Sequence, residues 1–241
     1  MKESIFDKEM KDPSFQAVYK KVATKLKVNG TFESVQGEGR YTGFPVLFIR
    51  LSGCTRKCSF CDTKYHIQNK QLSVAQLIKI IERSKMSTVV WTGGEPLLQL
   101  PAIQEVIKGT SVTKDHHIET NGDLIKKKGD LRNLNLFKGL IYYFEYVCIS
   151  PKEKKVAKRI SGLRDAFLSS IRKKIDIKVV TDLDKVGKDM VKYATTLMPL
   201  TTYNKSKDQK IRQKVWSYCI KKNLNYSARI HAMIWGNKKR V

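Results

Sequence analysis

Short apolar runs rich in β-branched residues alternate along the chain with segments in which apolar positions recur every three or four residues. The runs are typical of buried strands and the segments of amphipathic helices. The predicted strands lie at residues 44–50, 88–91, 117–120, 146–150, 175–180 and 195–197. A helix between two strands carries the chain back across the sheet, so this alternation predicts an α/β fold with a parallel sheet.

Helical periodicity is clearest after Ser73, where Val74, Leu77, Ile78 and Ile81 would share one face. Ser73 itself is a predicted N-cap, because its hydroxyl can accept a hydrogen bond from a free amide of the first turn. Further helices are predicted at residues 101–108, 162–173 and 207–221.

Two regions depart from this pattern. Residues 1–28 are polar and charged and are expected to form an N-terminal extension, and residues 126–143 are irregular enough to be an insertion. Residues 29–241 are expected to form one core domain. A chain of 241 residues with 41% hydrophobic residues can bury one substantial core.

Charge changes the picture of possible partners. The chain has 47 Lys and Arg against 22 Asp and Glu, a net charge of +25, concentrated at residues 151–174 with a second basic stretch at 205–222. Such a surplus favours anionic partners but says little about fold. No run approaches the about 20 apolar residues of a membrane span, and the N-terminus lacks the apolar segment of a signal peptide. We therefore expect a cytoplasmic protein without membrane contact.

Three of the five cysteines point to more specific chemistry. Cys54, Cys58 and Cys61 fall within eight residues with the spacing C-x3-C-x2-C, so that one loop can wrap several thiolates around a single inorganic centre. An iron–sulfur cubane usually takes four thiolates, and three would leave one iron open to a substrate or cofactor. A zinc site would need a fourth ligand, for which His66 is the short-range candidate.

The other two cysteines lack such a pattern. Cys148 lies in an apolar run and Cys219 in a helical pattern, so both are expected to be core thiols. The odd total and the missing export signal argue against a disulfide framework.

A glycine-rich segment, Thr92-Gly93-Gly94-Glu95-Pro96, follows the strand at 88–91. Without side chains at the two glycines, backbone groups can approach and hydrogen-bond a ligand's ammonium group. Together with the cysteine loop, in which Phe60 precedes the last cysteine, this segment resembles the radical S-adenosylmethionine (SAM) superfamily. The resemblance implies a modified, partial (β/α)6-type radical SAM barrel. It also implies a [4Fe-4S] cluster on Cys54, Cys58 and Cys61, with SAM bound to the open iron, and an electron donor such as flavodoxin or ferredoxin.

Three further segments narrow the resemblance: Ser34-Val35-Gln36-Gly37-Glu38-Gly39, Cys61-Asp62-Thr63 and Ser150-Pro151-Lys152. They resemble the family of 7-carboxy-7-deazaguanine synthases over about residues 29–236, and Ile230-His231 and Ile234-Trp235-Gly236-Asn237 match the usual ending. The resemblance implies conversion of 6-carboxy-5,6,7,8-tetrahydropterin to 7-carboxy-7-deazaguanine, a queuosine precursor, with release of ammonia. It also implies dependence on Mg²⁺ and a homodimer.

The same resemblance assigns roles to individual positions. Substrate contacts are expected from Val35, Gln36, Gly37, Arg50 and Thr92. SAM contacts are expected from Phe60, Cys61, Asp62, Gly94, Ser150, Pro151, Lys152, Met198, Pro199 and Leu200. The planar fork of Arg50 suits a substrate carboxylate, and the hydroxyl of Thr63 would bind Mg²⁺, which prefers oxygen ligands. Met198 departs from the pattern, because relatives commonly have Gln at that place.

Two other functions stay open at this point. A radical SAM activase that installs a glycyl radical on a partner protein would share the cysteine loop, but it gives no reason for Gln36-Gly37-Glu38-Gly39 or Thr63. A basic nucleic-acid-binding protein with a structural metal would use the basic stretches, and its binding would weaken steeply with salt. We find no recognised nucleic-acid-binding motif in support of it.

Several polar residues allow two interpretations of their role. Glu38 and Glu95 are expected either as solvated turn carboxylates or as ligand contacts. His116 and His117 are expected at the surface or behind the site, not as ligands, and His231 is expected in the core or in the site.

Overall fold

One curved sheet organises the part of the chain that the computed structural model describes, residues 25–58, 70–126, 131–236 and 238. Its strand order is β3-β1-β2-β4-β5-β6-β7-β8-β9. The strands are β1 (Lys25–Val35), β2 (Pro45–Leu51), β3 (Lys70–Ser73), β4 (Thr88–Gly93), β5 (Asp115–Thr120), β6 (Tyr146–Ile149), β7 (Ile175–Thr181), β8 (Thr196–Pro199) and β9 (Asn225–Tyr226).

The strands from β2 through β4, β5, β6, β7 and β8 to β9 pair in parallel, each with the next. Among the described strands, β1 pairs antiparallel with both of its neighbours, β2 and β3. The sequence-based prediction of an α/β fold with a parallel sheet is confirmed, and six of the parallel strands correspond to the predicted runs.

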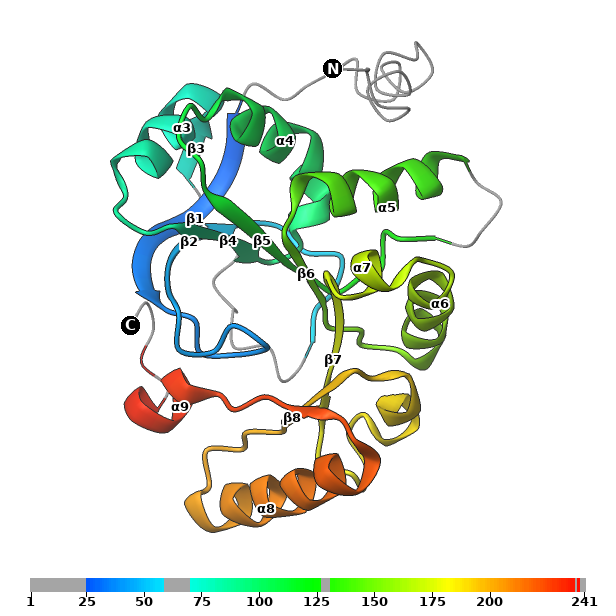
Figure 1. The fold of residues 1–241 in the computed structure, drawn as a ribbon. Coiled ribbons are helices and arrows are strands. Elements are labelled where there is room, and N and C mark those ends of the chain that lie inside the picture. The colour runs from blue at the N-terminus through cyan, green and yellow to red at the C-terminus, as the bar shows by residue number, and fades with distance from the viewer. Residues whose placement is uncertain (1–24, 59–69, 127–130, 237, 239–241) are drawn as a thin grey trace.

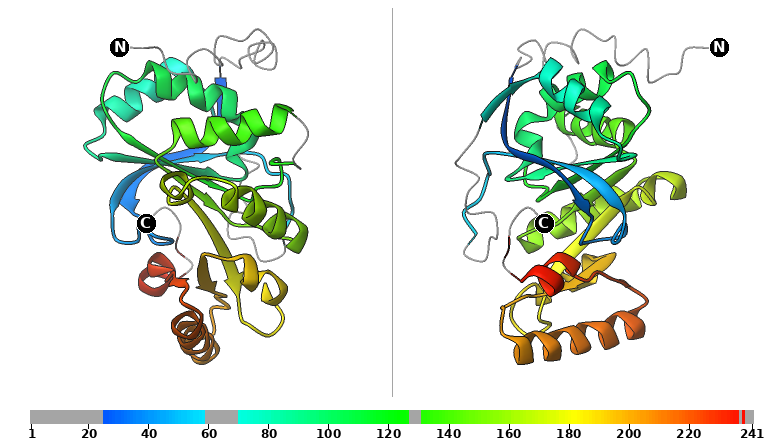
Figure 2. Two further views of the ribbon diagram at one scale, coloured as in Figure 1. Left: turned by 45° about the vertical axis from the view of Figure 1, so that its right-hand side comes forward. Right: turned by 90° about the vertical axis from the view of Figure 1, so that its left-hand side faces the viewer.

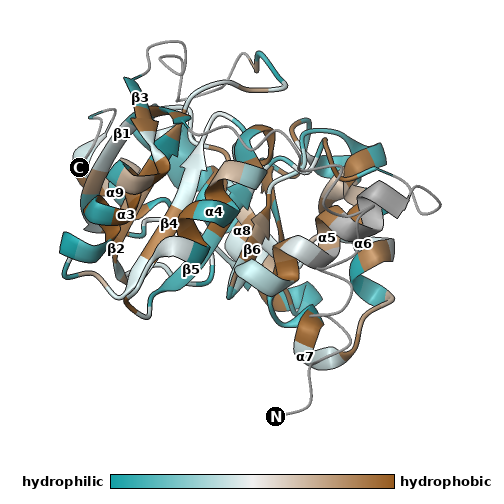
Figure 3. Cartoon of the chain, turned by 90° about the horizontal axis from the view of Figure 1, so that it is seen from above, coloured by the Kyte–Doolittle hydropathy of each residue, from teal (hydrophilic) through white to brown (hydrophobic). Residues whose placement is uncertain are grey.

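Most helices connect strands and lie outside the curved sheet (Figure 1), whereas the last one, α9 (Ile230–Trp235), follows β9 and contributes His231 to the cavity wall. The helices are α3 (Val74–Arg83), η1 (Pro96–Gln99), α4 (Leu100–Gly109), α5 (Leu131–Tyr143), α6 (Lys154–Asp165), α7 (Ser169–Arg172), η2 (Lys188–Tyr193), α8 (Lys205–Lys222) and α9. Figure 2 shows α3 and α4 at one end of the sheet and α8 at the other. In Figure 3 many of these helices carry both hydrophilic and hydrophobic residues. This is expected where one face of a helix packs against a sheet and the other faces solvent.

Helix α3 shows how local sequence sets an element. The Ser73 hydroxyl accepts a hydrogen bond from the Gln76 amide, and the Gln76 side chain accepts one from the Ser73 amide, which completes a capping box. Leu77 and Ile81 of this helix are buried. The predicted N-cap and apolar face are confirmed.

The strand register places the core on one face of the sheet and the site on the other. Ile49, Trp91, Ile118, Val147 and Ile175 stand side by side on five neighbouring strands, and all are completely buried in the hydrophobic core. Each such side chain contributes about 2 kcal/mol through burial. Successive residues of a strand point to opposite faces, so the next row of residues faces the inside of the curve.

That inner row is polar. Arg50 pairs with Thr92, and Glu119 pairs with Cys148, which in turn pairs with Asp176. The register thus gathers the chemically reactive side chains of separate strands on the concave face.

Three expectations about elements need correction. The irregular region at 126–143 contains the crossover helix α5, whose Phe137 and Leu140 are buried in the core, so it is part of the fold and not an insertion. The helix predicted at 162–173 starts earlier, as α6, because Val156, Ala157 and Ile160 form its buried face between basic residues that obscure the periodicity. A short helix, α7, follows it.

The third correction concerns the expected N-terminal extension. Strand β1 starts at Lys25, and Leu26 and Val28 are buried, so residues 25–28 belong to the sheet. The boundary expected at residue 28 falls inside this strand. Residues 1–24 lie outside the described part, and for them the extension stays a prediction. Within the described ranges, no helix is long and apolar enough to cross a membrane.

Candidate functional site

A cavity of about 280 Å³ lies at the carboxyl ends of the parallel strands, where ligands bind in sheets of this kind. The polar inner row contributes Arg50, Thr92, Glu119 and Cys148 to its wall. The residues predicted from sequence that line it are Gln36, Arg50, Cys54, Cys58, Thr92, Gly94, Ser150, Lys152, Met198 and Leu200. Segments far apart in the sequence therefore meet in one place.

Other predicted residues lie elsewhere or cannot be placed. Val35, Gly37, Pro151 and Pro199 are not among the described residues of the cavity wall. Phe60, Cys61, Asp62 and Thr63 lie outside the described residues.

Gly37 lies directly behind the wall. A Cβ atom there would come within 2.3 Å of the His231 Nδ1 atom, and the Gly37 carbonyl accepts a hydrogen bond from the Ile230 amide at 3.0 Å. The missing side chain lets α9 pack against this loop and brings His231, one-third exposed, to the cavity wall.

Cys54 and Cys58 both line the cavity and are partly exposed. The loop that carries them is held by Arg56, whose Nη2 atom donates to Asp123 Oδ1 at 2.7 Å and whose Nη1 atom lies 2.8 Å from Glu153 Oε1. Hydrogen bonding to Asp123 is the main reason that the pKa of Arg56 is raised above its usual value. The cysteine loop is therefore tied to the ends of both β5 and β6.

The glycine-rich segment packs against the same loop. A Cβ atom at Gly94 would lie 1.8 Å from the Gly53 carbonyl oxygen, and one at Gly93, with φ +123°, would lie 2.2 Å from the Leu51 oxygen. The Gly94 amide donates to Leu51 at 3.0 Å. Only glycine permits this approach, which places Cys54 beside the glycine turn.

Glu95 supports this turn from behind. Its carboxylate accepts hydrogen bonds from the Thr120 hydroxyl at 2.6 Å, the Asn121 amide at 2.8 Å and the Leu97 amide at 3.0 Å. It is completely buried, and burial raises its pKa. The expectation of a solvated carboxylate is wrong, and Glu95 is not among the described residues that line the cavity.

Arg50 lies on the opposite side from the charged residues of the C-terminal strands. Its guanidinium group stacks over the Phe32 ring at 5.1 Å from the centroid, and Phe32 stacks on Phe48 at 5.2 Å. The two rings hold the guanidinium plane at the cavity wall. A planar donor in such a place can bind both oxygens of a carboxylate.

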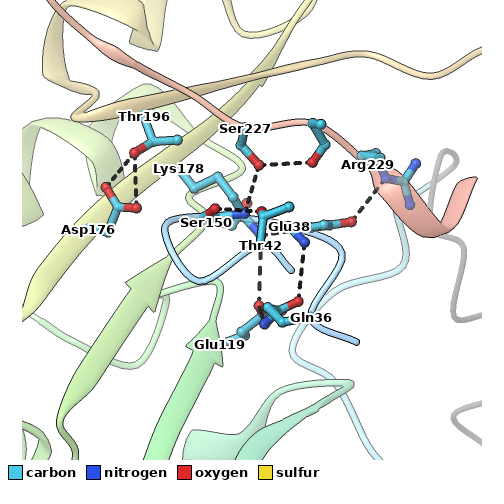
Figure 4. Close-up of polar contacts among 12 residues, drawn as sticks. Gln36, Glu38, Thr42, Glu119, Ser150, Asp176, Lys178, Thr196, Ser227 and Arg229 are labelled. Carbon is cyan, nitrogen blue, oxygen red and sulfur yellow. Dashed lines mark hydrogen bonds and ion pairs between the residues drawn. The ribbon is translucent and has the colours of Figure 1, made fainter. Parts of the chain in front are cut away.

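Sequence reasoning missed a polar wall formed by Glu119, Lys178 and Arg229, and had left Glu38 undecided. Lys178 Nζ donates to Glu38 Oε2 at 2.7 Å, and Arg229 Nε donates to Glu38 Oε1 at 2.9 Å (Figure 4). Burial alone would raise the pKa of Glu38, but the two cations hold that pKa well below its usual value. The signal that could have found Lys178 is a lone lysine inside the apolar run of β7.

The structure confirms some of the predictions for the histidines and the two remaining cysteines and corrects others. His116 and His117 are buried rather than exposed, and burial lowers the pKa of each to about 4, so both are neutral at pH 7. Trp91 Nε1 donates to His116 Nδ1 at 3.0 Å. Cys219 is a buried core thiol, as expected. Cys148 is buried too, but it also lines the cavity, and burial raises its pKa to about 12.

The cavity fits an iron–sulfur cluster as far as it is described. Two thiols of the C-x3-C-x2-C motif converge beside a turn that only glycines can form. Among the described residues no three His, Cys, Asp or Glu side chains form a metal site. The third predicted cluster ligand, Cys61, and the predicted magnesium ligand, Thr63, lie outside those residues.

Comparison with known proteins supports the same chemistry. The model of the radical SAM superfamily matches residues 48–183. A 7-carboxy-7-deazaguanine synthase of Hyperthermus butylicus is 30% identical over 228 residues, which cover 88% of this chain and 93% of that protein. A protein of the same name from Thermoplasma acidophilum is 37% identical over 164 residues, 66% of this chain and 73% of that one.

Among solved structures, QueE from Escherichia coli is similar in fold, with a TM-score of 0.58 and 21% identity, and the similarity covers 87% of this chain and 96% of that one. The chain belongs to the radical SAM superfamily and, within it, to the family of 7-carboxy-7-deazaguanine synthases.

Proposed function

We propose that this chain converts 6-carboxy-5,6,7,8-tetrahydropterin to 7-carboxy-7-deazaguanine with release of ammonia, a step toward 7-deazapurines such as queuosine. The observation that supports this most strongly is a single cavity that joins the Cys54 and Cys58 thiols to Arg50 and Thr92. When bound, the [4Fe-4S] cluster and SAM supply a 5′-deoxyadenosyl radical, which starts the reaction by taking a hydrogen atom from the substrate.

The residues of the chain bind and orient the substrate. Arg50, fixed on the Phe32 ring, binds the substrate carboxylate through its two parallel N–H groups. Gln36 and Thr92 line the same cavity and contact the substrate ring. Val35 and Gly37 flank Gln36 and position its backbone beside the ring. Holding the ring in one orientation limits which of its hydrogens meets the radical.

A second set of residues holds SAM. The Gly94 backbone and the Ser150 and Lys152 side chains line the cavity together, and Lys152 Nζ donates to Ser150 Oγ at 3.1 Å. Met198, which replaces the Gln common in relatives, lines the wall with Val180 and Leu200. These three side chains form an apolar surface on which a flat base can pack, without the polar contact that Gln would add.

Four further assignments extend this proposal. Thr63 would contribute an oxygen ligand to Mg²⁺, and Phe60, Cys61 and Asp62 would complete the cofactor site. A flavodoxin or ferredoxin supplies the electron, and two copies of the chain form a dimer. Light scattering of the purified protein measures the dimer, and turnover with and without Mg²⁺ measures the metal requirement.

Anaerobic turnover tests the function. The reconstituted protein is supplied with SAM, dithionite and the carboxytetrahydropterin, and products are separated by liquid chromatography. We expect a deazapurine and ammonia in equal amounts. Release of 5′-deoxyadenosine without a deazapurine would instead favour the glycyl-radical activase.

A further inference from the structure

A buried lysine on the inner face of the sheet has no assigned role. Lys178 lies in the middle of β7, two residues after Asp176, and its side chain is only 3% exposed. An ammonium group is costly to bury, by several kcal/mol, unless carboxylates compensate it. A lysine in the wall of a reaction cavity therefore needs an explanation.

The compensation comes from two carboxylates on different elements. Lys178 Nζ lies 2.7 Å from Glu38 Oε2, in the loop after β1, and 3.9 Å from Glu119 Oε1 on β5. Burial alone would lower the pKa of Lys178, but its anionic neighbours hold that pKa well above the usual value. The lysine is therefore charged at neutral pH.

The same two residues also hold the Gln36 side chain, Glu119 through its carboxylate and Glu38 through its backbone amide. Gln36 Nε2 donates to Glu119 Oε1 at 3.0 Å, and Gln36 Oε1 accepts from the Glu38 amide at 3.2 Å. Lys178, Glu38, Gln36 and Glu119 thus form a closed ring of contacts around one side of the cavity, most of it visible in Figure 4. The ring fixes which end of the Gln36 amide faces which neighbour.

The charges in this wall balance. Glu38 and Glu119 carry two negative charges, and Lys178 and Arg229 carry two positive ones, with Arg229 Nε 2.9 Å from Glu38. Arg50 remains across the cavity as a further cation. Arg56 and Lys152 line the cavity as well, so an anionic substrate enters a cavity in which cations outnumber carboxylates.

We propose that Lys178 is a positioning residue of the substrate cavity, which holds Glu38 and Glu119 as a charge-balanced wall and fixes the Gln36 amide for the substrate ring. The inference rests on the proposed function, because the substrate is the carboxytetrahydropterin. Without Lys178, two carboxylates share one permanent cation, and the extra negative charge repels the substrate carboxylate. The Gln36 amide also loses its fixed orientation.

The groups that face Lys178 determine how this loss depends on pH. Glu38 after β1, Glu119 on β5 and Cys148 on β6 act on Lys178 directly. Behind them, Arg229 and His231 near the C-terminus contact Glu38, and Asp176 on β7 acts on Cys148. Cys148 stays a neutral thiol, and Asp176 is held by the Tyr146 hydroxyl at 2.6 Å. Without Lys178, Glu38 loses one of the cations that lower its pKa and keeps the burial that raises it, so a proton on Glu38 can replace the missing cation as the pH falls. The informative quantity is the ratio of the affinities of variant and wild type, because effects common to both proteins cancel in it.

The test measures substrate affinity by anaerobic calorimetry on the reconstituted enzyme, with SAM and without reductant. We expect Lys178→Met to bind the carboxytetrahydropterin at least about tenfold more weakly than wild type at about pH 8. That ratio should fall below about threefold at about pH 6. The double variant Lys178→Met/Glu38→Gln, which restores the charge balance, should show a ratio that does not change with pH.

The controls separate this role from a structural one. Lys210→Met removes an exposed lysine on α8 and should match wild type at both pH values. Where Lys178→Met does not fold, as judged by circular dichroism, Lys178→Gln provides the same comparison. Equal affinity of wild type and variant at about pH 8, or a loss that is the same at both pH values, would overturn the proposal. A wild-type enzyme that does not bind the pterin at all would contradict the proposed function itself.

Discussion

The surroundings of each thiol, more than its residue type, decide what a cysteine of this chain can do. Cys54 and Cys58 are partly exposed in the cavity wall, where a thiolate can meet iron. Cys219 is buried against the core from α8 and behaves as a small apolar side chain. Cys148 lines the cavity like Cys54 and Cys58 but is buried like Cys219, and its burial keeps the thiol protonated.

Substitution of single cysteines tests this distinction. Cys58→Ala should lose the brown absorbance of the reconstituted cluster and all turnover, because two thiolates do not hold a cubane. Cys219→Ala should keep both, with a loss of about 1 kcal/mol in the free energy of unfolding from the missing sulfur. Visible absorbance after reconstitution is the measurement. A Cys219→Ala protein as colourless as Cys58→Ala would contradict the assignment of ligands.

Among the elements, the cysteine loop depends on neighbours that are distant in sequence. Arg56 connects it to Asp123 after β5 and to Glu153 before α6, and the Thr55 hydroxyl donates to Asp123 at 3.0 Å. These contacts hold the loop before any cluster binds. The contacts of Arg56 and Thr55 should slow the opening of the loop and thus the loss of iron from the cluster.

Removal of the Arg56 ion pairs should therefore speed the loss of the cluster. Arg56→Ala is expected to release iron to a chelator about tenfold faster than wild type, which corresponds to about 1.4 kcal/mol of loop stabilisation. Lys57→Ala is the matched control, because Lys57 is exposed in the same loop. The decay of cluster absorbance gives the rate. Equal rates for Arg56→Ala and Lys57→Ala would show that the ion pairs do not hold the loop.

The glycine turn gives a second test on this scale. Gly94→Ala would place a Cβ atom 1.8 Å from the Gly53 oxygen, so the cysteine loop must move and cluster content should fall severalfold. In α6, by contrast, a Cβ atom at Gly162 meets nothing within 4 Å. Gly162→Ala should raise the unfolding free energy by about 0.5–1 kcal/mol, since alanine favours helix. Thermal unfolding and iron analysis distinguish the two, and normal iron content in Gly94→Ala would contradict the close approach.

Sequence predicts the strands well and the inner wall poorly, for a physical reason. The runs at 88–91 and 175–180 are mostly apolar because parallel strands are buried on both faces, and this signal is local. The inward direction of Lys178 follows from register and from strand pairing over long distances, which no local pattern contains. The helix at 131–143 is missed because its apolar positions are interrupted by polar ones. Strand β1 is missed because lysines alternate with its buried residues.

At the scale of the whole molecule, the net charge of +25 is still larger than the site requires. Lys154, Lys155 and Lys158 are exposed on α6, which begins beside the cavity, and Glu153 at its N-cap contacts Arg56 of the cysteine loop. An acidic electron donor that approaches the cluster would be attracted by this surface. Such attraction raises association rates and weakens with salt.

The salt dependence of turnover tests whether the positive surface attracts the electron donor. Turnover driven by a reduced flavodoxin below saturation should fall about tenfold between about 50 and 300 mM salt, because the opposite charges are screened. Turnover driven by reduced methyl viologen, a small cation, should not fall in this way. Flavodoxin-driven turnover that does not respond to salt would leave the surplus charge without a part in electron transfer.

The most direct test of the account is the mass of the product. The enzyme is reduced anaerobically with SAM and 6-carboxy-5,6,7,8-tetrahydropterin, and the reaction is analysed by high-resolution mass spectrometry together with an ammonia assay. The account predicts a product lighter than the substrate by one ammonia, with one ammonia released for each product formed. Unchanged substrate in the presence of newly formed 5′-deoxyadenosine would contradict it.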